Sequence, residues 1–135
     1  MIRFLTESII MAIHSDQVRL YGGTYEVRES SVLDSALHLH MPQAQFDGQF
    51  LHPTIFHMAA AYGFHLCQNY PFLDDNKRTA GMAMFTFLQL NGLEPVTTEI
   101  DYYQVMMEIA NGHMNKEQIA RWLQTITDGT VPEIE

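Results

Sequence analysis

Two consecutive apolar segments constrain the fold of this chain more than any other feature. Residues 53–69 carry apolar side chains around most of a helical circumference, and residues 76–91 repeat this pattern. A helix with so little polar surface has to be buried on several sides, so both segments predict central helices. Pro53 suits the first turn of the earlier helix, and Gly92 ends the later one.

Shorter amphipathic segments surround this pair, and each begins at a residue type that commonly caps helices. Their predicted ranges, each starting at its cap, are 6–21, 31–41, 98–111 and 115–127. In the first of them, Ile10, Ile13 and Leu20 follow helical spacing; the third bears Ile100, Tyr103, Val105, Met106 and Ile109. We therefore predict an all-α, single-domain bundle of about six helices over residues 1–128, with a polar tail at 129–135.

Residues 43–52 interrupt the helical pattern. Asp47-Gly48 is a strong turn signal between short flanks that carry Phe46 and Phe50. The segment is interpreted as a loop or a small β-hairpin whose exposed edge could accept an extended peptide. An ordinary surface connection is the alternative.

Composition limits the classes of protein to which the chain can belong. Apolar residues make up 47% of the chain, which indicates a globular protein, and no apolar run is long enough to cross a membrane. The start of the chain does not have the pattern of a secretory signal. The single cysteine, Cys67, excludes an internal disulfide and fits a reducing, cytoplasmic location, and its apolar surroundings predict a buried side chain.

Charge argues against a nucleic-acid-binding surface, because the net charge is −9 and the chain has 7 Lys and Arg residues. Two of these cations, Lys77 and Arg78, are adjacent. The 7 histidines are scattered without the spacing of a zinc site, so structural or surface roles are expected for them.

The stretch Tyr70–Ala80 joins the two predicted central helices. Pro71 disfavours helix at the preceding residue, and Asp74, Asp75 and Asn76 are all good helix N-cap types. The stretch therefore predicts a helix end, a tight loop and a helix start. A polar loop between two buried helices is held rigidly, as a binding site requires.

Lys77 and Arg78 would lie in the first turn of the helix that follows, where the helix dipole slightly disfavours cations. Two cations at this end suggest an anion between them and the unpaired backbone N–H groups, and phosphate is the usual one. Asp74 adds a hard oxygen ligand suited to magnesium. These residues predict a phosphate or nucleotide site; a capped helix with solvated charges remains the alternative.

The same stretch resembles the signature of the Fic/Doc family, which reads His, any residue, Phe, any residue, Asp or Glu, usually Gly, Asn, any residue, Arg. The corresponding residues here are Tyr70-Pro71-Phe72-x-Asp74-x-Asn76-Lys77-Arg78-Thr79-Ala80. The opening of the chain resembles the death-on-curing (Doc) branch through Ile13-His14-x-Asp16-Gln17, Tyr21-Gly22-Gly23 and Val32-Leu33-x-Ser35-Ala36-Leu37, and Asn91-Gly92 matches as well. The similarity extends to about residue 127.

The resemblance implies a Fic-like helical fold that binds ATP and Mg²⁺ around this signature. Asp74 would ligate the metal ion, and Phe72 would anchor the loop in the core. The cofactor-binding residues would be Asp75, Asn76, Lys77 and Arg78. Of these, Asn76 and Arg78 would hold phosphate oxygens and Lys77 would add positive charge. The family's flap, which aligns the target segment, would correspond to residues 43–52 and is centred on Gln45, Phe46, Asp47 and Gly48.

The resemblance also implies a toxin of a toxin–antitoxin pair. Doc toxins act as kinases that pass the γ-phosphate of ATP to a translation elongation factor, and a small antitoxin protein neutralises them. Many Fic enzymes instead transfer AMP to a hydroxyl, but their signature usually has a second Arg where this chain has Gly81. The Doc branch is therefore favoured. The partners implied are an antitoxin and a protein of the translation machinery, with no nucleic acid and no membrane.

Tyr70 stands where the family has its catalytic histidine, so the implied catalytic set is Tyr70, Lys77 and Arg78. With a reference pKa of about 10, roughly one tyrosine in a thousand is ionised at neutral pH. Loss of a general base typically costs about 100- to 10,000-fold, so we expect strongly reduced activity. Tyr70 could be an introduced substitution, the mark of an inactive nucleotide- or antitoxin-binding relative, or a variant with altered chemistry; it could also simply pack at the helix end.

Overall fold

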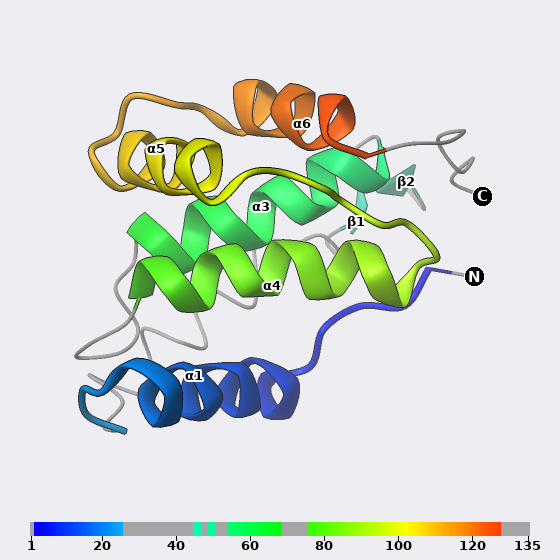
Figure 1. Ribbon diagram of the computed structural model, residues 1–135. Helices are drawn as coiled ribbons and strands as arrows, with labels where there is room; N and C mark the ends of the chain where they lie inside the picture. The colour runs from blue at the N-terminus through cyan, green and yellow to red at the C-terminus, as the bar shows by residue number, and fades with distance from the viewer. Residues whose placement is uncertain (1, 26–44, 47–48, 51–53, 69–75, 128–135) are drawn as a thin grey trace.

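The computed structural model describes residues 2–25, 45–46, 49–50, 54–68 and 76–127, and these form helices with one small pair of strands (Figure 1). The helices are α1 Glu7–Tyr21, α3 Ile55–Gln68, α4 Asn76–Leu90, α5 Glu99–Ala110 and α6 Lys116–Thr125. The strands are β1 Gln45–Phe46 and β2 Gln49–Phe50. The all-α prediction is confirmed for this part of the chain, whereas the helix predicted at 31–41 and the tail at 129–135 lie outside it.

The two apolar segments that the sequence singled out form the centre of the molecule. Helices α3 and α4 pack along each other, α1 lies against α4, and α6 lies against α3, while α5 touches both central helices (Figure 1). The connection that carries the predicted signature therefore joins the two central helices, as expected.

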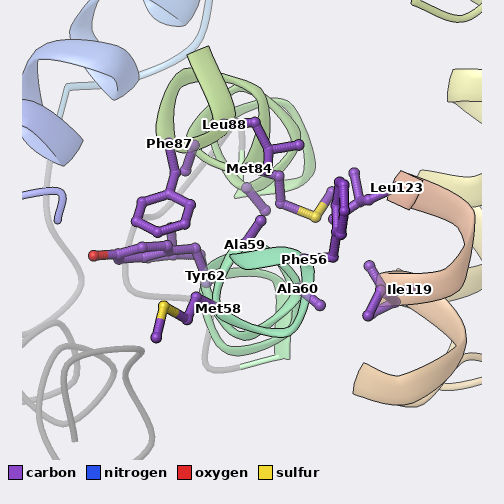
Figure 2. Packing of buried hydrophobic residues seen from close by; sticks show 14 of the residues in the cluster. Phe56, Met58, Ala59, Ala60, Tyr62, Met84, Phe87, Leu88, Ile119 and Leu123 are labelled. Carbon is purple, nitrogen blue, oxygen red and sulfur yellow. The ribbon is translucent and has the colours of Figure 1, made fainter. Parts of the chain in front are cut away.

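The core consists mainly of side chains from α3 and α4, which lie side by side, together with side chains from α6 (Figure 2) and a few from α1 and α5. Its fully buried members include Met58, Tyr62, Met84 and Phe87, and the Tyr62 and Phe87 ring centroids are 5.2 Å apart. Gly63 permits this close approach, because a Cβ atom there would lie 2.7 Å from Met84 Cγ.

Helix α1 buries a different stripe from the one predicted. Ile10, His14, Gln17 and Val18 are buried, whereas Leu20 is 54% exposed. The buried residues follow the spacing i, i+4, i+7, i+8 of one narrow face, and Leu20 lies off that face. Among the elements that the structure describes, α1 packs mainly on α4, and this narrow face carries its fully buried residues.

Most predicted helix ends are confirmed. Thr6 and Thr98 cap α1 and α5, and Asn115 forms the predicted capping box with Gln118 at the start of α6. Gly22 and Gly92 both have φ of +84°, in the left-handed region typical of residues that end helices.

Two predicted ends are displaced. Helix α3 starts at Ile55 because the Thr54 hydroxyl oxygen accepts the backbone N–H of His57 at 3.2 Å; Pro53, predicted in the first turn, lies outside the described residues. Helix α6 ends at Thr125 and not at Thr127, because Thr127 pairs with Pro95 as an isolated antiparallel bridge.

Helix α5 buries less than its sequence suggested. Met106 and Ile109 are buried, but Ile100 and Tyr103 are 71% and 65% exposed. Because α5 contacts only one end of the α3–α4 pair, part of its apolar stripe stays exposed to solvent.

The strands β1 and β2 pair antiparallel, with Gln45 opposite Phe50 and Phe46 opposite Gln49. The hairpin interpretation is therefore confirmed over the simple loop, although Asp47 and Gly48 themselves are not described.

None of the helices in the described ranges combines the length and the apolar character that spanning a membrane requires.

Candidate phosphate-binding site

The candidate site is the first turn of α4. Asn76 begins the helix and is half-buried, Lys77 and Arg78 are exposed, and the first turn contains no acidic side chain. The partial positive charge of this helix end therefore coincides with two cations. This donor set suits an anion, and nothing in the turn opposes one.

The two cations contact different neighbouring helices. Lys77 Nζ lies 3.3 Å from Met107 Sδ on α5, whereas the Arg78 guanidinium carbon lies 4.7 Å from the ring centroid of Tyr21 at the end of α1. Consecutive helical residues point about 100° apart, so one turn directs the two side chains toward opposite flanks of α4. An anion approaching the helix end would meet positive charge from both sides.

A buried hydroxyl follows these cations. Thr79 is 1% exposed, and its Oγ1 has no hydrogen-bond partner within the described residues. A buried polar atom without a partner is costly, so we expect its partner to lie beyond the described residues or in a bound ligand.

Several predicted site residues lie outside the part that the structure describes, namely Tyr70, Phe72, Asp74, Asp75, Asp47 and Gly48. Gln45 and Phe46 lie in β1, where the backbone pairing is defined. Within the described ranges, no three or more His, Cys, Asp or Glu side chains gather as a metal site would require. The magnesium role of Asp74 stays a prediction.

Gly81 lies one turn into α4, directly against α5. A Cβ atom at Gly81 would collide with the hydroxyl of Tyr102 and would lie 2.7 Å from its Cζ. The Tyr102 ring makes an edge-to-face contact with Phe85 at 5.4 Å, and burial raises the pKa of Tyr102 to about 12. Tyr102 therefore fills the space that any side chain at position 81 would need.

Two further titratable residues, Cys67 and His65, lie on α3. Cys67 is fully buried, and burial raises the pKa of its thiol to about 11, so the prediction of a buried, unreactive side chain is confirmed. His65 is also buried, and its Nε2 lies 3.2 Å from Lys116 Nζ on α6.

Sequence reasoning missed the residues that border the site from other helices: Tyr21, Tyr102 and Met107. The Tyr21-Gly22-Gly23 motif was recognised, but no role was assigned to its tyrosine. These contacts join residues distant in the chain, and no periodicity within one segment could have revealed them.

Comparisons with known proteins give the family. A family model described as "Fic/DOC family" matches residues 4–88, a range that includes α1, α3, most of α4 and the whole Tyr70–Ala80 stretch. A protein named Toxin Doc from Mycolicibacterium smegmatis is 34% identical over 102 residues, which cover 74% of this chain and 77% of that protein. This chain belongs to the Fic/DOC family.

Proposed function

We propose that this chain is a Doc-type toxin that transfers the γ-phosphate of ATP to a hydroxyl of a protein of the translation machinery, and that a small antitoxin neutralises it. Family membership and the likeness to a protein named Toxin Doc support this assignment. The observation that carries it is the first turn of α4, where Lys77 and Arg78 stand at a helix N-terminus and the turn itself contains no acidic residue.

The residues present suit a triphosphate. Asn76 and Arg78 would hold its oxygens at the start of α4, Lys77 would add positive charge, and Asp74 would hold a magnesium ion. ATP supplies the phosphoryl group. The protein contributes position and charge, which account for most of the catalysis of phosphoryl transfer.

Transfer of phosphate, and not of AMP, is supported by the packing around Gly81. The AMP-transferring signature usually has its second arginine at this position. Tyr102 occupies the adjacent space, so an arginine here would have to displace a largely buried ring of α5. We keep AMP transfer as an alternative outcome of the test below.

Tyr70 sets the expected level of activity. A phenol that stays protonated at neutral pH is a poor proton acceptor, so the attacking hydroxyl would have to pass its proton to water. Positioning and charge stabilisation would survive, and nucleotide binding would therefore be retained while turnover is strongly reduced.

Restoring histidine at position 70 tests this proposal. We expect Tyr70→His to increase phosphate transfer from γ-labelled ATP to a lysate protein by roughly 100- to 10,000-fold, and to arrest growth when expressed without an antitoxin. Tyr70→Phe is the matched control and should leave transfer at the starting level. Adding Arg78→Ala to the Tyr70→His variant should abolish transfer.

Other outcomes separate the alternatives. A target that gains one AMP and not one phosphate would establish the AMP-transferring activity. ATP binding in calorimetry with no transfer by either form would indicate a non-catalytic binding module. If neither form bound ATP with magnesium, the proposed site itself would be wrong.

A further inference from the structure

The Tyr-Gly-Gly sequence at the end of α1 gives Tyr21 an unusual position. Tyr21 is the last residue of α1, and both glycines after it have left-handed backbones, with φ of +84° at Gly22 and +117° at Gly23. The Gly22 N–H donates to the Val18 carbonyl at 2.7 Å, which ends the helix. The tyrosine ring is consequently left 62% exposed.

The structure assigns this ring a positioning role: we propose that Tyr21 holds the Arg78 guanidinium at the start of α4 in the orientation that phosphate binding needs. The benefit to phosphate binding rests on the function proposed above, whereas the contact itself does not. The guanidinium carbon lies 4.7 Å from the ring centroid, within the range of a cation–π interaction.

The chemistry of the guanidinium allows both contacts at once. Stacking on an aromatic ring uses the flat face of the group, whereas bidentate hydrogen bonds to phosphate use the N–H groups at its edge. A long arginine side chain loses considerable rotamer freedom when it binds a ligand. A ring that already restricts the side chain reduces this loss and so strengthens phosphate binding.

Lys77, the other cation of this turn, has no comparable aromatic contact among the described residues. Lys77 is also exposed, but its Nζ lies against the Met107 sulfur, which is a weak acceptor. Tyr21 also approaches α5: burial raises the pKa of Tyr102, and the nearby Tyr21 phenol raises it further. Tyr21 at the end of α1 therefore contacts Arg78 of α4, and its phenol is near enough to Tyr102 of α5 to affect the pKa of that residue.

Two readouts on the full chain test this role. In the first, the Nε–Hε resonance of Arg78 is recorded by ¹⁵N NMR without nucleotide. We expect an upfield ring-current displacement that disappears in Tyr21→Ala and persists in Tyr21→Phe. Leu20→Ala, which changes an equally exposed neighbour on the same helix, should leave the resonance in place.

In the second readout, calorimetry measures the dissociation constant for ATP with magnesium. We expect Tyr21→Ala to weaken ATP binding by about 2- to 5-fold, because the Arg78 side chain then has to be ordered when the nucleotide binds, and Tyr21→Phe and Leu20→Ala to leave it unchanged. The midpoint of thermal unfolding should stay within about a few degrees of the parent's for all three variants, because both side chains are exposed.

The outcomes are distinguishable. If the Arg78 resonance has the same chemical shift in Tyr21→Ala as in the parent protein, the proposal is wrong. It is also wrong if Tyr21→Ala and Tyr21→Phe weaken ATP binding equally. If the parent protein binds no ATP, the proposed function fails and with it the phosphate role, while the NMR readout still decides whether Tyr21 holds Arg78.

Discussion

At the scale of single residues, Gly81 and Tyr102 illustrate how one contact can restrict chemistry. Alanine in the middle of a helix is normally favoured over glycine by about 1 kcal/mol. At Gly81 the added methyl group would collide with the Tyr102 hydroxyl, and overpacking typically costs about 1–3 kcal/mol. Tyr102 cannot move away easily, because it is largely buried against Phe85. The steric cost therefore exceeds the gain in helix propensity.

We predict that Gly81→Ala lowers the free energy of unfolding by up to about 2 kcal/mol, the steric cost less the gain in helix propensity. Removing the opposing hydroxyl by Tyr102→Phe should relieve part of this cost. The double variant should therefore lose less unfolding free energy than the sum of the losses in the two single variants. Urea unfolding of the four proteins measures the coupling. Strictly additive effects would contradict the proposed collision.

At the scale of elements, α6 depends on its first turn. It has 10 residues, a length at which an isolated helix is marginal. Its first two residues reach α3: Glu117 pairs with His57 at 2.5 Å, and Lys116 contacts His65 at 3.2 Å. The capping box formed by Asn115 and Gln118 fixes the turn from which both contacts start.

We predict that Asn115→Ala destabilises the protein by about 1 kcal/mol, because an orphan N–H group at the start of α6 loses its acceptor. The rate of amide hydrogen exchange should increase more in α6 than in the other helices. Gln124→Ala, at an exposed position of the same helix, serves as the control and should change stability by less than about 0.5 kcal/mol. Equal effects of the two substitutions would show that the cap is dispensable.

At the scale of the whole molecule, three weakly acidic side chains among the described residues, in or against the core, are held in their neutral form. Burial raises the pKa of Cys67 to about 11 from 9.0, that of Tyr102 to about 12 from 10.0, and that of Tyr62 further still. Tyr62 also pins the N-terminal segment, since its hydroxyl oxygen accepts the Leu5 N–H at 2.9 Å. Each group must stay protonated while the chain is folded.

We predict that the protein loses stability in alkali. The folded pKa of each group exceeds its unfolded value, so the full stability is present below about pH 9 and is lost as the pH rises through the folded values. The free energy of unfolding should fall by roughly 1 kcal/mol per pH unit for each proton that only the unfolded chain releases. Urea titrations from about pH 8 to about pH 11 measure this slope. This range runs from below the ordinary pKa of Cys67 to its value in the folded protein.

The matched control for the pH dependence is Cys67→Ala, which removes the first group to titrate. The variant should show a shallower slope between about pH 9 and pH 10, with the steeper fall beginning only where tyrosine titrates. An unchanged slope would mean that the thiol does not contribute.

Local chemistry determined much of this protein. The capping residues Thr6, Thr98 and Asn115, the helix stop at Gly22, and the burial of the two apolar helices follow from interactions within one or two turns, which the sequence displays directly. The charges of Lys77 and Arg78 at a helix start also indicated an anion site, because both features lie in one short stretch.

Tertiary structure decided what depends on which helices meet. The exposure of Leu20, Ile100 and Tyr103 follows from how little of α1 and α5 the central pair covers. The ring of Tyr21 under Arg78 and the hydroxyl of Tyr102 against Gly81 join residues far apart in the chain. Helical periodicity indicates which face of a segment is apolar, but only tertiary packing determines which other segment that face contacts.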